Sequence, residues 1–376
     1  MKQLVDRKKT YFISGGGTGG HIYPAIAVAR ELLNQSDTDK IYYIGNKDNL
    51  EHEIISKIPE IEFLSVGVSG MPRKPGIKFL KWFVELEIAT WKALLYVIKY
   101  KPDAIFTTGG YVSAPVAFAS ILLNKPFMIH DCDVEPGLVS KLVASSAKIV
   151  SVAFSKSKEF LKSGNAVCNG NPVREEFFSV SKAEAQKSLG LKNKLTIFAM
   201  GGSQGAKTIN KSVLGVAQEL VEQLDIQLVL QTGMKNYMDV IEQFEAYFPH
   251  FRENTNLIIR PYFDEMALPL KAADIVIARA GSLSLSEMNI CALPSILIPY
   301  PYAAADHQRK NAKEMQQNGA SLYLEDSECN KNSLMNYLKE LIVDSEKRKQ
   351  MSISAQKLAK PDATSCIVTQ LKSLIK

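Results

Sequence analysis

Residues 11–29 read YFISGGGTGGHIYPAIAVA and contain the signature of an α/β fold. The apolar run Tyr11–Ser14 predicts a short buried strand, and the apolar spacing from Pro24 onward predicts a helix. Between them lies Gly15–Gly20, in which five of the six residues are glycine. Glycines let backbone N–H groups approach an anion closely, and a helix N-terminus adds a favourable dipole. This stretch therefore predicts a strand, an anion-binding turn and a helix in succession.

Two further turns of this kind follow later in the chain. GGSQG (201–205) comes after an apolar run and before a helix expected from Ala206. RAGSLSLSE (279–287) comes after another apolar run, with Ser282 as a plausible helix N-cap. Because a glycine-rich turn follows the first strand of each half of the chain, we expect one architecture to be used twice.

Short β-branched or aromatic runs alternate with helical patterns along the whole chain. Nearly continuous apolar strands separated by helices are typical of parallel sheets covered on both faces. We therefore predict an α/β fold of two Rossmann-like, doubly wound domains, at residues 1–175 and 176–360. Residues 361–376 form a last helix, beginning near Pro361, that can pack on either domain. The expected strands are 11–14, 41–45, 61–66, 104–108, 127–131, 148–152, 195–200, 227–232, 256–260, 274–278, 295–299 and 321–324.

Composition excludes several classes of protein. The 376 residues include 45 basic and 39 acidic side chains, and a net charge of +6 is too small for a chain wrapped on nucleic acid. The five cysteines are scattered, with no C-x-x-C pair, which favours reduced thiols over a disulfide frame or a zinc site. No apolar run reaches the ~18–20 residues of a spanning helix, and the first residues do not resemble a signal peptide.

The first glycine turn matches G-x-G-x-x-G, which alone is a weak signal for dinucleotides. The second strand ends in Tyr43-Ile44-Gly45-Asn46, without the acidic residue that holds a ribose in NAD enzymes. His21 stands where an ATP-binding P-loop needs lysine. A tight turn without a ligand remains an alternative, although so many glycines make a purely structural turn entropically costly.

Three side chains are candidates for the chemistry of a sugar nucleotide. Imidazole titrates near neutrality, so His21, directly after the first turn, is a candidate general base; a capping or phosphate-binding role is equally open. Ser203 and the amides around it can bind a diphosphate. Glu287 falls in the second turn of a helix at the same edge, where a carboxylate can accept both ribose hydroxyls; the alternative is a solvated surface glutamate.

From Gly15 to at least Ala312 the sequence closely resembles the peptidoglycan N-acetylglucosaminyltransferases that convert lipid I to lipid II. The matching segments occur in order and at that family's spacings. They are GGGTGGHIYPAIAVA (15–29), TGGYVSAP (108–115), GNPVR (170–174), GGSQGAKTIN (201–210), RAGSLSLSE (279–287) and PYPYAAADHQRKNA (299–312).

The resemblance implies a GT-B fold, with its two domains facing a cleft, and an inverting reaction. It implies UDP-GlcNAc as donor substrate and undecaprenyl-pyrophosphoryl-MurNAc-pentapeptide (lipid I) as acceptor, without nucleic acid. No resident cofactor or metal site is expected, and assistance by a divalent cation stays open. The expected location is peripheral, on the cytoplasmic face of the bacterial inner membrane.

The resemblance also implies roles for individual positions. His21 is the candidate base for the acceptor hydroxyl. The other matched positions are Thr18, Gly19 and Gly20 for the sugar and the acceptor diphosphate, Arg174 and Ser203 for the donor diphosphate, Phe263 for the uracil edge, Ser282, Leu283 and Ser284 for the donor phosphate and sugar, Glu287 for the ribose, and Gln308 for the GlcNAc hydroxyls.

One segment departs from the family pattern. The family usually reads His-Glu-Gln-Asn, whereas this chain reads His130-Asp131-Cys132-Asp133. Asp133 thus replaces an amide expected to touch the donor sugar. A carboxylate can accept from a sugar hydroxyl but cannot donate, and it would repel a nearby phosphate. Either the contact is acceptor-only, or Arg174 or a cation offsets the charge.

Residues 71–101 combine seven basic and two acidic side chains with both tryptophans of the chain. We expect Ile77, Leu80, Val84, Ile88 and Trp91 to pack on the sheet. That packing leaves Phe79, Trp82, Phe83 and Leu86 for another apolar surface. With flanking lysines, this pattern favours contact of Phe79, Trp82 and Phe83 with an anionic membrane surface. The alternative is that they cover the domain's own core or a second subunit.

Three rival functions remain from the sequence. A UDP-GlcNAc 2-epimerase shares the two-half architecture but needs no lipid acceptor. A regulatory sugar-nucleotide-binding protein would keep Ser203 and Glu287 but would not need His21. An NAD-dependent oxidoreductase is less favoured, because the acidic residue is missing.

Overall fold

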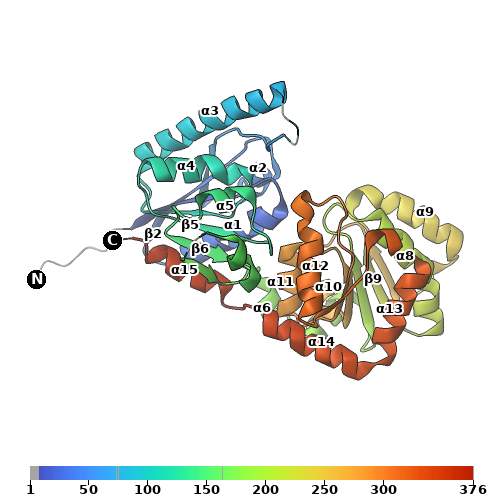
Figure 1. Cartoon of the computed structure of the whole chain (residues 1–376). Coiled ribbons are helices and arrows are strands. Elements are labelled where there is room, and N and C mark those ends of the chain that lie inside the picture. The colour runs from blue at the N-terminus through green and yellow to red at the C-terminus, as the bar shows by residue number, and fades with distance from the viewer. Residues whose placement is uncertain (1–7, 73, 75, 163, 376) are drawn as a thin grey trace, which may run out of the picture. The chain divides into compact units, whose positions relative to one another are not determined.

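The computed structural model describes residues 8–72, 74, 76–162 and 164–375. The chain forms two compact units (Figure 1). Unit 1 comprises the residues up to Arg174 together with those from Lys360 onward, and unit 2 comprises Glu175–Ala359. Each unit contains one parallel β-sheet, as the alternation of strands and helices predicts.

Unit 1 contains a seven-stranded sheet in the order β3-β2-β1-β4-β5-β6-β7. All six strands expected in this half are present. The prediction missed β7, because this edge strand has three residues and no buried side chain. The strands are β1 (Lys9–Ser14), β2 (Thr38–Gly45), β3 (Ile61–Ser65), β4 (Ala104–Thr107), β5 (Phe127–Asp131), β6 (Ile149–Val152) and β7 (Ala166–Cys168).

Helices cover both faces of this sheet. They are α1 (Gly19–Leu33), α2 (Leu50–Ile55), α3 (Ile77–Tyr100), α4 (Ala114–Leu122), α5 (Leu138–Val143) and α15 (Ala363–Lys372). Alternate residues of β1 point to opposite faces. Tyr11 and Ile13 pack with α1 and α15, whereas Phe12 packs with α3 and α4. The last helix therefore completes the core of unit 1.

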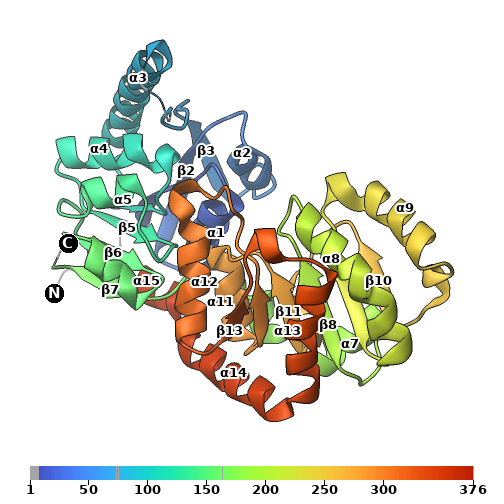
Figure 2. The same ribbon diagram turned by 45° about the vertical axis from the view of Figure 1, so that its right-hand side comes forward.

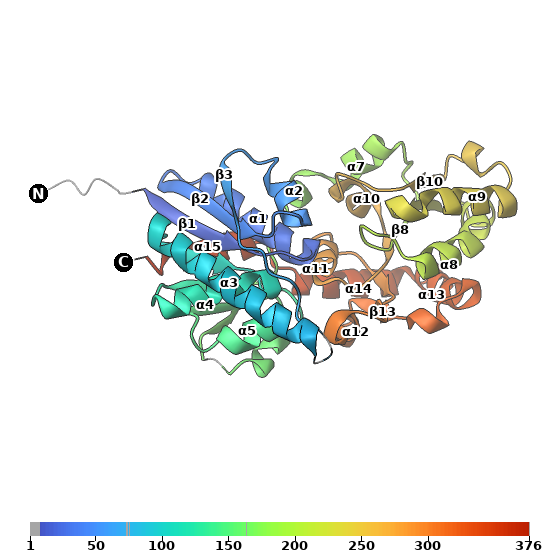
Figure 3. The same ribbon diagram turned by 90° about the horizontal axis from the view of Figure 1, so that it is seen from above.

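Helix α3 runs along unit 1 beside α4 (Figure 3). Its buried residues are Ala89, Ala93 and Val97, four positions apart, so this stripe faces the core. The opposite side is exposed and apolar, with Ile77, Leu80, Val84, Ile88, Trp91, Leu95 and Ile98. The expectation that Ile77, Leu80, Val84, Ile88 and Trp91 pack on the sheet is therefore wrong. Alanines allow a close approach to α4, which the apolar spacing alone did not show.

Unit 2 contains a six-stranded parallel sheet in the order β10-β9-β8-β11-β12-β13. All six strands expected here are present. They are β8 (Thr196–Met200), β9 (Gln227–Gln231), β10 (Leu257–Arg260), β11 (Ile275–Ala278), β12 (Ser295–Leu297) and β13 (Ser321–Tyr323). The helices are α6 (Glu176–Ser179), α7 (Lys182–Leu189), α8 (Lys207–Gln218), α9 (Tyr237–Tyr247), α10 (Ala267–Ala272), α11 (Ser282–Ile290), α12 (His307–Gln317), α13 (Lys331–Val343) and α14 (Ser345–Leu358).

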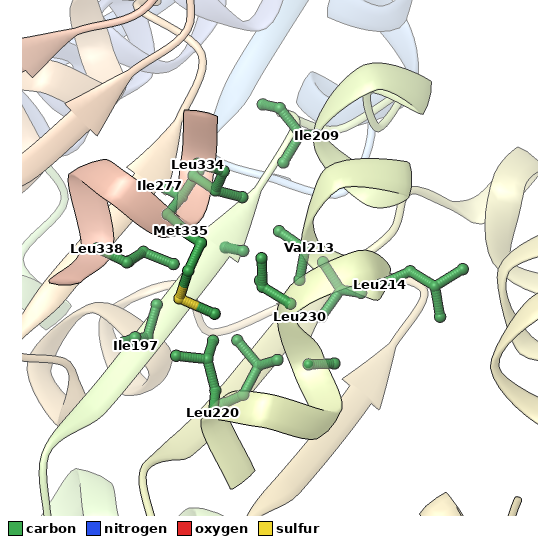
Figure 4. Packing of buried hydrophobic residues seen from close by; sticks show 14 of the residues in the cluster. Ile197, Ile209, Val213, Leu214, Leu220, Leu230, Ile277, Leu334, Met335 and Leu338 are labelled. Carbon is green, nitrogen blue, oxygen red and sulfur yellow. The ribbon is translucent and has the colours of Figure 1, made fainter. Parts of the chain in front are cut away.

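One face of this sheet packs against α8 and α13, which are in contact (Figure 2). Figure 4 shows Ile197, Leu230 and Ile277 of the sheet meeting side chains of both helices. The helix side chains labelled there are Ile209, Val213, Leu214, Leu334, Met335 and Leu338. This apolar core fixes the strands whose carboxyl ends carry the glycine turns of unit 2.

Each sheet has one point where the strand order reverses. In unit 1 it lies between β1 and β4, and in unit 2 between β8 and β11. Open α/β sheets bind ligands outside the carboxyl ends of the strands at such a point. The turns after these four strands are 15–18, 108–110, 201–206 and 279–281. All three glycine turns found in the sequence therefore lie at the positions where this fold binds ligands.

Candidate active site

The first glycine turn is anchored at Gly15 and Gly17 by residues of the neighbouring strand β2 and helix α2. The buried Tyr43 hydroxyl donates to the Gly15 carbonyl oxygen at 2.6 Å. The Gly17 N–H donates to Oε2 of Glu51 at 3.4 Å, and Gly17 has φ +86, which favours glycine. Added Cβ atoms on Gly15 or Gly16 would lie within 3 Å of neighbouring atoms. The glycines are therefore needed for close packing as well as for any ligand.

Helix α1 begins at Gly19, so the expectation of a start near Pro24 is wrong. Thr18 is the N-cap residue, and its side chain makes no capping hydrogen bond. Pro24 lies inside the helix. The amides of Gly19 and Gly20 thus belong to the first turn of a 15-residue helix, the place where a dipole favours an anion.

His21 lies in this first turn, and its ring orientation is fixed by Thr108, the residue directly after β4. Its Nδ1 lies 2.8 Å from the carbonyl oxygen of Thr108, and the Thr108 hydroxyl donates to the His21 carbonyl oxygen at 2.7 Å. Because a carbonyl oxygen can only accept, Nδ1 carries the proton of the neutral ring. Nε2 then keeps its lone pair. This is the tautomer that a general base needs.

Gly110 borders the same ring. It has φ +72, and an added Cβ would lie 3.2 Å from Cδ2 and 3.5 Å from Nε2 of His21. A larger residue would therefore press on the edge of the imidazole that carries Nε2. The motif TGGYVSAP thus contributes to the site by supporting His21, a role that the sequence did not reveal.

The segment that departs from the family pattern, residues 130–133, spans the end of β5 and the turn after it. Asp131 is buried, and its carboxylate accepts from the Gly137 N–H, the Ser140 hydroxyl and the Asp133 N–H. Burial, followed by the charge of Asp133, raises the pKa of the Asp131 carboxyl. Asp131 therefore orders the turn after β5. Asp133 lies in this turn, at the carboxyl edge of the sheet, and is half-buried. The Cys132 thiol, 3.3 Å from the Gly20 carbonyl oxygen, joins this turn to α1.

His130 is fully buried and has a structural role. Its Nδ1 bonds the Ser151 hydroxyl and its Nε2 bonds Oδ1 of Asn171, each at 2.9 Å. Burial lowers the pKa of His130 to about 4, so the ring is neutral at pH 7. Asn171 belongs to the GNPVR motif, and its amide also donates to the Cys132 carbonyl oxygen. This network holds the GNPVR segment against β5.

Arg174 ends the same motif and packs with unit 1. Its guanidinium lies over the ring of Tyr23, 5.6 Å from the centroid. Tyr23 is two residues from His21 on α1. The structure therefore brings Arg174 into the neighbourhood of Thr18, Gly19, Gly20 and His21.

In unit 2, the turn 201–205 packs tightly while Ser203 stays exposed. An added Cβ on Gly205 would lie 1.9 Å from the Thr232 carbonyl oxygen. The Asn236 amide donates to the Gln204 carbonyl oxygen at 3.0 Å. Helix α8 begins at Lys207, close to the expected start.

The third turn is held by Arg279. Its guanidinium donates to the carbonyl oxygens of Ile298 and Pro299 and forms a 2.5 Å ion pair with Asp326. Helix α11 has Gly281 as its N-cap, so the expectation that Ser282 is the cap is wrong; Ser282 is its first residue. Leu283 and Ser284 follow in the first turn, and Glu287 is 4% exposed in the second.

Two side chains connect these turns of unit 2. The buried Gln231, at the end of β9, accepts from the Phe263 N–H at 3.0 Å and donates to the Gly202 carbonyl oxygen at 3.4 Å. The Phe263 N–H is therefore already used within the protein. Asn311 of α12 donates to the Ala280 carbonyl oxygen at 3.2 Å.

Gln308 lies in the first turn of α12, and its Oε1 accepts from the Tyr300 N–H at 2.9 Å. Ala305 and Asp306, directly before this helix, both have positive φ without being glycine. Such backbone strain clusters at functional loops. Gln231, Arg279 and Asn311, to which the sequence assigned no role, thus hold the backbone segments that carry the candidate residues of unit 2.

The described residues contain no group of three or more His, Cys, Asp or Glu side chains able to hold a metal ion. No helix among them is both long and apolar enough to cross a membrane.

Comparisons with known proteins match this architecture. Residues 11–152 match the glycosyltransferase family 28 N-terminal domain, and residues 196–367 match the glycosyltransferase family 28 C-terminal domain. The chain belongs to glycosyltransferase family 28. The GT-B architecture of this family agrees with the two parallel-sheet units described above.

Curated family 28 relatives match almost the entire chain. A protein of Caldicellulosiruptor saccharolyticus is 37% identical over 353 residues, covering 93% of this chain and 94% of the relative. A protein of Desulforamulus reducens is 34% identical over 365 residues, covering 96% and 98%. Both are named UDP-N-acetylglucosamine–N-acetylmuramyl-(pentapeptide) pyrophosphoryl-undecaprenol N-acetylglucosamine transferase. Among solved structures, Acinetobacter baumannii MurG matches with a TM-score of 0.78 and 24% identity, covering 97% of this chain and 99% of that one.

Proposed function

We propose that this family 28 enzyme transfers N-acetylglucosamine from UDP-GlcNAc to the 4-hydroxyl of the N-acetylmuramyl residue of lipid I, giving lipid II for peptidoglycan. The transfer is the reaction named for the relatives that share 34–37% of their residues with it. The structural observation of most weight is His21, whose Nδ1–H is bonded to Thr108 so that Nε2 can accept a proton.

The proposed mechanism is a single displacement. As the bond from the sugar to UDP breaks, negative charge grows on the diphosphate. The amides at the N-terminus of α11, the turn 201–205 and the Arg174 guanidinium can stabilise this charge. Nε2 of His21 accepts the proton of the acceptor hydroxyl as that oxygen attacks the anomeric carbon, and the configuration inverts. Glu287 accepts hydrogen bonds from the ribose, and Gln308 contacts the GlcNAc hydroxyls.

The remaining substrate contacts are proposals of the same kind. Thr18, Gly19 and Gly20 meet the acceptor diphosphate at the start of α1. Ser203, Ser282, Leu283 and Ser284 contact the donor phosphates and sugar. Phe263 reads the uracil edge through its carbonyl oxygen, since its N–H donates to Gln231. Asp133 accepts from a sugar hydroxyl and does not donate.

A transfer assay tests this function. Purified protein with UDP-GlcNAc and a short-chain lipid I analogue is expected to release UDP only when both substrates are present. Release of UDP with 2-epimerised sugar in the absence of acceptor would instead identify an epimerase. Tight UDP-GlcNAc binding without turnover would identify a regulatory protein. Repeating the assay with a chelator settles whether a divalent cation assists.

We also propose that unit 1 contacts an anionic membrane surface through α3, at the cytoplasmic face of the inner membrane. The outer face of α3 exposes Leu80, Val84 and Trp91 by 55–67%, and six described lysines lie between residues 74 and 101. An apolar face flanked by lysines suits shallow insertion among anionic lipids. Arg73, which the sequence analysis counts with these basic residues, lies outside the described residues.

Phe79 and Phe83 are exposed at the N-terminal end of the same helix and extend the proposed contact. Trp82 is less exposed. Its ring packs with Phe79 at 5.2 Å, and its indole N–H donates to the Ser69 carbonyl oxygen at 3.0 Å. Trp82 therefore holds the preceding loop, and we expect its contribution to lipid contact to be smaller than that of the two phenylalanines.

Changing Leu80, Val84 and Trp91 together to serine is expected to lower partitioning onto phosphatidylglycerol-containing vesicles by roughly 100-fold, because three large apolar groups no longer leave water. Vesicle sedimentation measures the effect. A matched control changes Met238, Tyr247 and Val343 to serine, which are as exposed but lie on unit 2. Turnover of a soluble acceptor should be retained by both variants. Equal vesicle binding by both variants would refute the membrane contact.

A further inference from the structure

Glu51 is a fully buried carboxylate beneath the first glycine turn. It lies in the first turn of α2, and its two oxygens face different backbone N–H groups. Oε1 accepts from Asn46 at 3.1 Å, and Oε2 accepts from Gly17 at 3.4 Å. A buried carboxylate is costly unless hydrogen bonds compensate it. The buried carboxylate of Glu51 therefore indicates a role that a neutral side chain would not fill.

The backbone packs so closely around the Glu51 side chain that two neighbouring positions have no space for a Cβ atom. An added Cβ on Gly16 would lie 2.7 Å from Oε1, and one on Gly45 would lie 2.8 Å from Cγ of Glu51. Glycine at both positions thus lets the glycine turn and the end of β2 close around the carboxylate. Glu51 also affects two neighbouring tyrosines. The pKa values of Tyr43 and Tyr111 are raised, first by burial and then by the charge of Glu51.

The physical need for an anchor follows from the turn itself. Residues 15–20 contain five glycines and lose much conformational entropy on folding, and glycine supplies no side chain to hold them. Converging N–H groups in such a turn attract an anion. Glu51 supplies that anion from within the protein for the Gly17 end, while Tyr43 holds the Gly15 end. The amides that remain for a ligand diphosphate are those of Gly19 and Gly20, at the start of α1.

We propose that Glu51 is a positioning residue for the transfer reaction, which holds the turn 15–18 so that α1 presents His21 in its reactive orientation. Glu51 does not touch the substrates. It acts through Gly17, which is followed by the N-cap Thr18 and then by the first turn of α1, where His21 lies. This inference depends on the proposed role of His21 as the base.

The test compares Glu51→Gln with Glu53→Gln. Glutamine keeps one accepting oxygen and places an NH₂ group against a backbone N–H, so one anchor is lost. Glu53 is on the same helix but is exposed and pairs with Lys57. We expect Glu51→Gln to lower kcat about 10- to 100-fold and to leave the KM for UDP-GlcNAc within twofold. Glu51→Asp, which keeps the charge on a shorter side chain, should retain more activity. Glu53→Gln should match the parent protein.

Two further measurements separate positioning from general damage. Hydrogen exchange in the peptide covering residues 15–22 should accelerate in Glu51→Gln and not in Glu53→Gln, while peptides of β4 and β5 stay protected. In a His21→Ala background, Glu51→Gln should have almost no further effect on kcat, because the residue through which it acts is gone. Unchanged exchange, full activity, or a fully additive effect would each overturn the proposal.

Failure of the underlying function gives a different pattern. If His21→Ala is as active as the parent protein, the role of His21 is wrong, whatever Glu51 does. If His21→Ala is impaired and Glu51→Gln is not, only the positioning role is wrong. If Glu51→Gln does not fold, Glu51→Asp supplies the same exchange and double-substitution measurements.

Discussion

Replacing His21 by alanine is expected to lower kcat by roughly 10²- to 10⁴-fold, the usual contribution of a general base. The Thr108 carbonyl oxygen accepts from Nδ1, which leaves Nε2 of the neutral ring as an acceptor. Alanine removes the only group in our mechanism that accepts the acceptor proton. Steady-state UDP release with saturating UDP-GlcNAc and lipid I analogue measures the loss. UDP-GlcNAc affinity should stay within about threefold, because His21 is not among the donor contacts that we propose.

His250→Ala is the matched control, since this histidine is exposed in unit 2 and pairs only loosely with Glu253. It should have parent-like kcat. If His21→Ala instead weakens acceptor binding and leaves kcat unchanged, His21 is a phosphate ligand, the alternative that the sequence left open. That result would leave the transfer reaction intact and move the base elsewhere.

Replacing Glu287 by alanine is expected to weaken UDP binding by roughly 30- to 1,000-fold. Two hydrogen bonds from ribose hydroxyls to a carboxylate contribute about 2–4 kcal/mol in total, and a factor of ten in affinity corresponds to about 1.4 kcal/mol. Glu287 is 4% exposed, so its side chain needs little further desolvation when a ribose binds. Isothermal titration with UDP measures the change.

A second ligand shows whether this loss is specific. The parent protein should bind 2′,3′-dideoxy-UDP more weakly than UDP by about the same factor, whereas Glu287→Ala should bind the two equally. General damage to α11 would weaken both ligands together and keep the difference between them. A preserved preference for the ribose in the variant would show that Glu287 does not hold it.

The sequence predicted the parts of the fold that depend on neighbours in the chain. Apolar runs of four to six residues predicted twelve of the thirteen strands found among the described residues, and the glycine turns were found directly. A parallel strand is buried on both faces, so its signal is a continuous apolar run that needs no knowledge of its partners. The missed strand, β7, is a short edge strand for which this signal is weak.

Helix α3 shows where such local signals fail. Its sequence is apolar in nearly all helical directions, so periodicity could not say which side faces the core. Packing against α4 decided it, and the stripe Ala89, Ala93 and Val97 is buried because small residues allow two helices to approach. The large residues expected inside are those left exposed.

The sequence by itself determined the parallel sheets, the glycine turns and, through its motifs, the candidate residues of a family 28 transferase. Only the tertiary structure decided how those residues are held. The tautomer of His21 depends on a carbonyl 87 residues away, and the first glycine turn depends on a carboxylate 34 residues from Gly17. Strand and turn propensities act between neighbours, whereas a hydrogen bond between distant residues exists only once the sheet has brought the ends of its strands together.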